Sequence, residues 1–136
     1  MDKYNFENDI NTFGVEVKNF PAGVDEAFNE LITKTGDAAG KRNYYGVSNM
    51  DSNGKMIYKA LAEEKYEGEA KEYAYEQITI EKGDYYFEVL KDWRTKTTCI
   101  KDIFNEMMND KRIDKTKPVV EWYKNDEEMW CMVKAI

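Results

Sequence analysis

The spacing of apolar residues divides the first half of the chain into a strand, a helix and a hairpin. Residues 12–20 alternate between apolar and polar positions, which predicts a strand. One face of this strand consists of Phe13, Val15 and Val17. Residues 24–35 carry apolar positions three and four apart, which predicts an amphipathic helix. Its apolar stripe consists of Val24, Ala27, Phe28, Leu31 and Ile32. Residues 44–50 and 56–62 predict a hairpin, because an Asn-Gly pair in the turn 51–54 supplies positive φ.

The second half shows the same order of elements after an additional strand. Residues 73–80 and 84–90 predict two strands joined by a Lys-Gly turn. Residues 95–109 have helical spacing. The buried stripe of this helix is expected to be Cys99, Ile100, Ile103, Phe104 and Met107. Residues 119–124 and 129–136 predict a closing hairpin.

Two short sequence echoes indicate that residues 12–62 and 73–136 are repeats of one strand–helix–strand–strand unit. The echoes are Val15-Glu16-Val17 with Phe87-Glu88-Val89, and Phe28-Asn29-Glu30-Leu31 with Phe104-Asn105-Glu106-Met107. One unit buries its apolar face poorly, and two units share a core. We therefore expect a single α+β domain over residues 1–136, with pseudo-twofold symmetry, an antiparallel sheet, two helices on one face and a ligand groove at the seam. Residues 1–11 are expected to be a loose leader, and residues 63–72 a link.

Composition excludes several classes of function. The net charge of −7 argues against binding to nucleic acid, since phosphate contacts need clustered Lys and Arg. The chain contains no histidine, and its two cysteines, Cys99 and Cys131, are expected to be reduced, buried thiols, so neither a metal nor another cofactor is expected. No apolar run approaches the roughly 20 residues of a membrane span, and no signal-like segment is found, which favours a cytoplasmic protein. Aromatic residues make up 14% of the chain, enough to line a binding groove as well as a core.

Five sequence segments carry a resemblance to a known family. They are Tyr44-Tyr45-Gly46, Thr79-Ile80-Glu81-Lys82-Gly83-Asp84-Tyr85, Asp92-Trp93, Glu121-Trp122-Tyr123 and Cys131-Met132-Val133. In this order the chain resembles the GyrI-like small-molecule-binding domain, which also serves as the effector-binding part of AraC-type and MerR-type transcription activators. The resemblance implies a groove with a central acid among aromatic rings, and Glu121 matches that acid. It also implies a stand-alone form, because only about eleven residues precede the first predicted strand.

Strand alternation assigns faces around this acid. Glu121 and Tyr123 share one face of residues 119–124, and Val120 and Trp122 share the other. We expect the bulky apolar pair to pack against the helix, which leaves Glu121 and Tyr123 in the groove. The expected ligand-binding residues are Glu121, Tyr123, Trp93, Tyr44 and Tyr58. From the residues alone, a solvated carboxylate on an open sheet face is the slightly favoured alternative, and it is the resemblance that favours the groove.

Adjacent aromatic pairs leave a further choice of face. We expect Tyr45 to join Val47 in the core and Tyr44 to face the groove, while the orientations of Tyr85 and Tyr86 stay open.

Three functions fit this pattern. The first is a stand-alone binder of bulky hydrophobic, cationic small molecules, for drug or effector sensing or for sequestration, with an additional protein partner left unidentified. The second is a hydrolase of electrophilic natural products, with Glu121 as acid or base and Tyr123 as its hydrogen-bond partner. The third is a protein inhibitor of a topoisomerase, which the name of the family suggests. An enclosed concave site favours the first two, and an exposed apolar patch favours the third.

Overall fold

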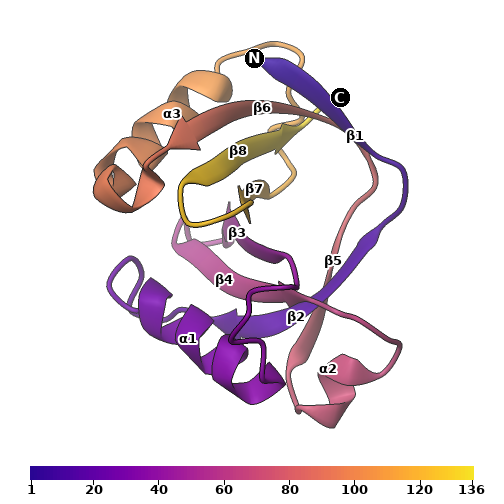
Figure 1. The fold of residues 1–136 in the computed structure, drawn as a ribbon. Coiled ribbons are helices and arrows are strands. Elements are labelled where there is room, and N and C mark those ends of the chain that lie inside the picture. Colours follow the sequence, from indigo (N-terminus) through magenta and orange to yellow (C-terminus); the bar gives the residue numbers. More distant parts are fainter.

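Eight strands form one antiparallel, curled sheet in the computed structural model, which describes all 136 residues (Figure 1). The strands are β1 (Asp2–Phe6), β2 (Ile10–Glu16), β3 (Tyr44–Met50), β4 (Met56–Glu63), β5 (Glu76–Ile80), β6 (Gly83–Lys91), β7 (Val119–Tyr123) and β8 (Glu128–Lys134). The helices are α1 (Val24–Thr35), α2 (Glu69–Glu72) and α3 (Ile100–Met107), and two 3₁₀ turns, Trp93–Thr95 and Thr97–Cys99, precede α3. None of these helices combines the length and apolar character needed to cross a membrane.

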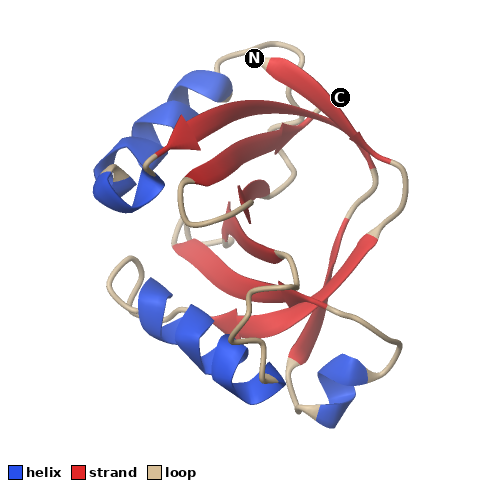
Figure 2. Ribbon diagram, in the orientation of Figure 1, coloured by secondary structure: helices blue, strands red, loops and turns tan.

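The order of the strands, β1-β6-β8-β7-β3-β4-β2-β5, is symmetric about the pair β3–β7. One unit, β2-α1-β3-β4, therefore meets the other, β6-α3-β7-β8, along a seam at the centre of the sheet, which confirms the predicted duplicated α+β fold. Helices α1 and α3 lie on the same flank of the sheet (Figure 2). The strand ahead of each unit pairs with the opposite unit, since β1 pairs with β6 and β5 pairs with β2.

The expectation of a loose leader over residues 1–11 is wrong, because β1 is an edge strand of the sheet. Its sequence is mostly polar, but Tyr4 and Phe6 alternate onto one face. Phe6 is buried against Trp122 and Tyr85, with ring centroids 5.5 Å and 5.3 Å away. A strand of five residues is stable here only because β6 supplies its hydrogen-bond partners.

Several predicted boundaries also differ. The strand predicted over residues 12–20 is β2, which spans Ile10–Glu16, and the strand predicted from residue 73 is β5, which begins at Glu76. The helix expected over residues 95–109 begins only at Ile100, after the 3₁₀ turns. Cys99 therefore lies in a 3₁₀ turn, where its thiol is exposed and not buried as expected, while Cys131 is buried.

The two faces of the sheet carry different cores. Val120 and Trp122 pack with Phe6, Tyr45 and Leu61 in a cluster that contains no helical residue. The helix-facing side carries two further clusters, in which α1 covers β2 and β4 while α3 covers β6 and β8. The expectation that Val120 and Trp122 pack against a helix is therefore wrong. Alternation along β7 predicts which residues share a face, but the curl of the sheet creates an apolar interior on the face away from the helices.

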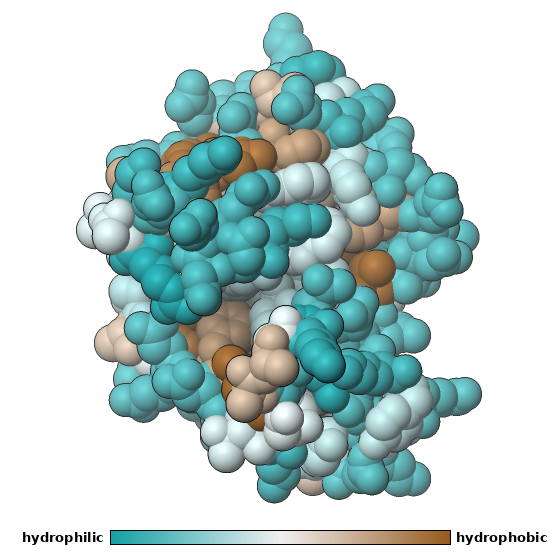
Figure 3. Space-filling view, in the orientation of Figure 1, coloured by the Kyte–Doolittle hydropathy of each residue, from teal (hydrophilic) through white to brown (hydrophobic).

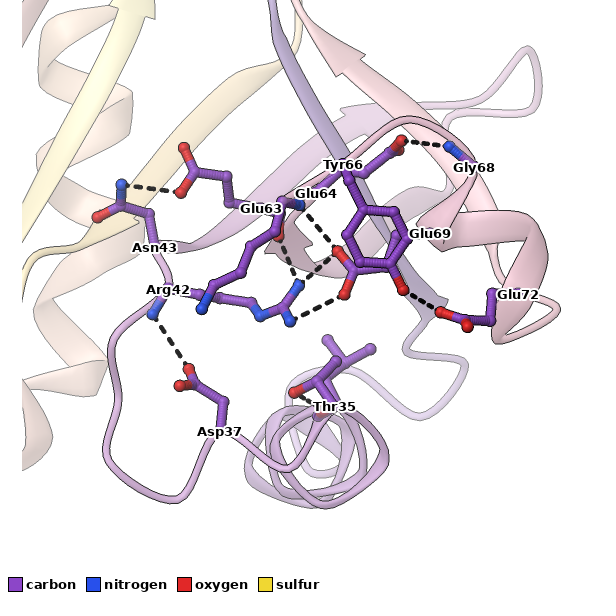
Figure 4. Close-up of polar contacts among 12 residues, drawn as sticks. Thr35, Asp37, Arg42, Asn43, Glu63, Glu64, Tyr66, Gly68, Glu69 and Glu72 are labelled. Atoms are coloured by element: carbon purple, nitrogen blue, oxygen red, sulfur yellow. Dashed lines mark hydrogen bonds and ion pairs between the residues drawn. The ribbon is translucent and has the colours of Figure 1, made fainter.

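A buried ion pair holds the link between the two units (Figure 4). The Arg42 guanidinium donates to both carboxylate oxygens of Glu69, at 2.7 Å and 2.9 Å, and to the main-chain oxygen of Glu63 at 2.9 Å. Glu69 also accepts a hydrogen bond from the main-chain N–H of Lys65 at 2.8 Å. Residues 63–72 are thus more than a link, because Glu69 anchors the short helix α2 to the loop that follows α1.

Candidate functional site

Glu121 lies on the seam between the two units, on the helix-facing side of the sheet. In the strand register it is opposite Gly46 of β3 and Cys131 of β8. Its neighbours along β7, Val120 and Trp122, point to the other face. Only 5% of Glu121 is exposed, so its carboxyl group is almost completely removed from water.

Two tyrosine hydroxyls hold this carboxylate. Tyr58, from the first unit, donates to Glu121 Oε1 at 2.8 Å, and Tyr123 donates to the same oxygen at 2.5 Å. The two hydroxyl oxygens lie 3.1 Å apart. No Lys, Arg or main-chain N–H of the chain pairs with the carboxylate. Glu121 is therefore a buried acid without a cationic partner, which is a costly arrangement in a protein interior.

Burial controls the protonation of all three groups. It raises the pKa of Glu121, and the hydrogen bonds from Tyr123 and Tyr58 oppose that rise by favouring the charged form. Burial, and then the neighbouring charge of Glu121, raise the pKa of Tyr58 and of Tyr123 well above the ordinary value for tyrosine. Both phenols thus stay protonated at neutral pH and act as donors. A cation brought next to Glu121 would lower its pKa again, so the site favours binding of positive charge.

Aromatic rings from both units surround this carboxylate. Phe20, from the loop between β2 and α1, stacks on Tyr58 with ring centroids 4.7 Å apart and planes at 18°. Phe28 of α1 and Trp93 of the first 3₁₀ turn both meet Tyr123 edge to face, at 5.1 Å and 4.9 Å. The space-filling view shows a hollow between the α1 and α3 sides of the molecule, with pale and brown atoms inside it (Figure 3).

The structure brings together most of the residues expected from the sequence. Glu121, Tyr123 and Tyr58 are in direct contact, and Trp93 touches Tyr123. Tyr44 lies at the periphery: its ring meets Phe28 at 6.2 Å and its hydroxyl donates to Asp37 at 2.7 Å.

Tyr45 packs with Val47 in the core on the other face, as expected. The two orientations left open are now clear, because Tyr85 joins that same core and Tyr86 faces α3.

Sequence reasoning missed two rings. Phe28 belongs to the apolar stripe of α1, which predicts a core residue, but its ring also contacts Tyr123 of the site. Alternation places Phe20 in the strand predicted over residues 12–20, but β2 ends at Glu16. The one local signal was Pro21, because the residue before a proline favours extended or turn backbone, which is typical of a loop. Nothing in the chain forms a group of three or more Cys, Asp or Glu side chains placed to hold a metal ion.

Comparison with known proteins gives matches in structure but not in sequence. No family model and no curated protein matches the chain. SAV2435, solved bound to tetraphenylphosphonium, has a TM-score of 0.66 and 13% identity, and the match covers 98% of this chain and 93% of that one. VCH_CASS2, an integron cassette protein from the mobile metagenome of Vibrio cholerae, has a TM-score of 0.65 and 13% identity, covering 99% and 95%. A proposed transcription regulation protein of Staphylococcus aureus MU50 has a TM-score of 0.60 and 13% identity, covering 98% and 97%. At this identity the likeness concerns the fold.

Proposed function

We propose that this chain is a GyrI-like protein that binds bulky hydrophobic cations at Glu121, in the hollow between α1 and α3. The observation that carries this proposal is the buried carboxylate of Glu121, which accepts two tyrosine hydroxyls and has no basic partner in the chain. A hydrated inorganic cation would have to lose its water to reach this position. A large organic cation is weakly hydrated and brings apolar surface that the surrounding rings can cover.

The electrostatics of the site favour such a ligand. A charge buried without a partner is unfavourable, and a cation that binds beside it restores the missing attraction. Where a ring face of Tyr123 or Trp93 meets the ligand, it adds cation–π attraction of about 0.5–2 kcal/mol, depending on how completely the cation is desolvated. Charge and ring faces therefore select the same class of molecule.

The structural neighbours agree with this class. SAV2435, which shares the fold over nearly the whole chain, is bound to tetraphenylphosphonium, a cation with four phenyl rings. The Staphylococcus aureus protein of the same fold is a proposed transcription regulation protein. We therefore propose sensing or sequestration of such compounds as the biological role.

The test uses two ions of the same shape and opposite charge. Tetraphenylphosphonium and tetraphenylborate are titrated into the wild-type protein and into Glu121→Gln by isothermal calorimetry. We expect the wild type to bind the phosphonium and to reject the borate. Glu121→Gln keeps the shape, so phosphonium binding should weaken by about 1–3 kcal/mol, the range for two unit charges about 5 Å apart between bulk water and an effective dielectric constant of about 20. If both ions bind alike, or the variant binds the phosphonium as tightly as the wild type, charge at Glu121 does not carry recognition.

The second candidate is hydrolysis of an electrophilic compound. It is favoured by the raised pKa of Glu121 and its 2.5 Å hydrogen bond to Tyr123, since a carboxyl group with a raised pKa can act as general acid or base. It ranks second because Glu121 is the single carboxylate of the cluster, and both neighbouring phenols stay protonated. Incubation with strained electrophiles, followed by mass spectrometry, separates the two: turnover that is lost in Glu121→Gln and in Tyr123→Phe would make the protein an enzyme.

A further inference from the structure

The ring of Phe20 is partly exposed to water and stacks on a buried residue of the candidate site. Phe20 is a large apolar side chain that is 39% exposed, yet it stacks almost parallel on Tyr58, which is only 1% exposed. Tyr58 is the residue whose hydroxyl donates to Glu121. Phe20 therefore covers a ring face of the tyrosine that bonds the buried carboxylate, while part of its own surface remains open to water.

The loop that carries Phe20 is weakly attached to the rest of the molecule. The last hydrogen bond between the main chain and the sheet before this loop is donated by the Val17 N–H to the main-chain oxygen of Tyr58, at 2.8 Å. Main-chain bonds of residues 18–23 stay within the loop and the start of α1: Ala22 N–H to Asn19 O at 2.9 Å, Val24 N–H to Pro21 O at 3.4 Å and Ala27 N–H to Gly23 O at 3.1 Å. Figure 1 shows this loop leading into α1. Few bonds would have to break for Phe20 to leave Tyr58, which makes it a low-stability segment.

We infer that the ligands of this site are cations that carry a flat aromatic ring, and that this ring replaces Phe20 on the face of Tyr58. This inference rests on the proposed function. A flat ligand ring reproduces the parallel contact that Phe20 makes, and its positive charge is attracted by the carboxylate of Glu121 that accepts the Tyr58 hydroxyl. An alkyl cation of equal charge has no ring to exchange for Phe20, so it gains less when the loop opens.

Phe20 is thus an intramolecular competitor of the ligand. The apparent affinity equals the intrinsic affinity multiplied by the fraction of molecules in which Phe20 is displaced. Removing the ring should therefore strengthen binding, whereas removing a residue that only contacts the ligand would weaken it. The direction in which affinity changes when Phe20 is removed therefore tells whether Phe20 competes with the ligand or only contacts it.

The experiment compares two monovalent cations, N-methylacridinium and tetrabutylammonium, by calorimetry with the wild type, Phe20→Ala, Glu121→Gln and the double variant. We expect the wild type to prefer N-methylacridinium by about tenfold, and Phe20→Ala to bind it about three- to tenfold more tightly than the wild type. Val89→Ala is the matched control, because Val89 is 40% exposed and belongs to no core cluster, and it should leave both affinities unchanged. Unchanged or weaker binding of N-methylacridinium by Phe20→Ala would overturn the inference.

A second measurement reads the displacement directly. With 4-fluorophenylalanine at position 20, the fluorine resonance should move toward its solvent value when N-methylacridinium is added, and a resonance that does not move contradicts the inference. The Glu121→Gln variants keep the two proposals apart. If Glu121→Gln weakens binding in both backgrounds while Phe20→Ala does not strengthen it, the proposed function stands and the role of Phe20 fails. If Glu121→Gln has no effect in either background, the proposed function fails, and the fluorine signal still decides on Phe20.

Discussion

Gly46 lies directly opposite Glu121 in the register of β3 and β7, and the missing side chain at Gly46 makes the room in which Tyr58 reaches the carboxylate. A Cβ atom at Gly46 would lie 2.1 Å from the Tyr58 hydroxyl oxygen and 2.9 Å from Glu121 Oε1. The glycine is therefore part of the site, although it contributes no chemical group to it.

Gly46→Ala should disturb both the site and the fold. The methyl group must push away the Tyr58 hydroxyl, so we expect a loss of about 1–3 kcal/mol in the free energy of unfolding, as for overpacked cores. Binding of tetraphenylphosphonium should weaken in parallel. Chemical denaturation and calorimetry measure the two effects. Asn49→Ala, at an exposed position on the same strand, is the control and should change neither. If Gly46→Ala unfolds with the same free energy as the wild type, Gly46 and the Tyr58 hydroxyl are not in close contact.

Glu121→Gln should change how stability depends on pH. An unfolded glutamate has a pKa of about 4.3, and burial raises the pKa of Glu121 above it in the folded state. Between these two values the folded protein binds more protons than the unfolded chain, so the wild type loses stability as pH rises through this window. Glu121→Gln lacks the titrating group. The free energy of unfolding of the variant, minus that of the wild type, should therefore increase with pH and then level off above the raised pKa. Urea titrations at several pH values test this, and a difference that falls with pH would contradict it.

Tyr123→Phe should move the pH dependence of cation binding. Binding needs the ionised carboxylate, so wild-type affinity should rise as pH increases through the raised pKa of Glu121. The hydrogen bond from Tyr123 favours the charged form, and its removal raises that pKa further. The pH at which cation affinity is half of its maximum should thus be higher in Tyr123→Phe than in the wild type. The shift should have the same direction in Tyr58→Phe. Tyr75 donates its hydroxyl to Glu30 and not to Glu121, so Tyr75→Phe is the control and should keep the wild-type midpoint. A shift to lower pH would show that the hydroxyls do not stabilise the charge.

Arg42→Met should be strongly destabilising because it leaves Glu69 buried without its partner. The pair is bidentate, with only 4% and 1% of the two side chains exposed. Removing one member of a buried pair costs about 3–5 kcal/mol, while replacing both with apolar residues costs far less. The double variant Arg42→Met with Glu69→Leu should therefore recover most of the loss in thermal unfolding. Lys59→Met, which breaks the solvent-exposed pair with Glu76, should cost no more than about 1 kcal/mol.

Phe6→Ala should test the role of β1. Because Phe6 is buried between Trp122 and Tyr85, the substitution should cost about 3–5 kcal/mol of the free energy of unfolding. Asn8→Ala, in the exposed turn between β1 and β2, should stay within about 0.5 kcal/mol of the wild type. If the two variants are equally stable, residues 1–11 behave as a loose leader after all.

Local patterns in the sequence determined the order of elements and the contents of each face. The period of two along β7 places Glu121 with Tyr123 and apart from Trp122, whatever the strand packs against. The helical spacing in residues 24–35 and the Asn-Gly turn are equally local, and the structure has both. Repetition of the same pattern in the second half was enough to predict the symmetric sheet.

Tertiary structure alone decided which face each set of residues occupies. Alternation defines two faces, but the curl of the sheet determines that Trp122 enters the interior and Glu121 lies under the helices. The strand β1 exists because β6, about eighty residues later, supplies its partner, and such a pairing leaves little signal in a segment of five residues that is mostly polar. The same holds for the site: Gly46 and Tyr58 meet Glu121 through strand register, and Phe20 meets Tyr58 through the path of its loop, which are non-local properties of the chain.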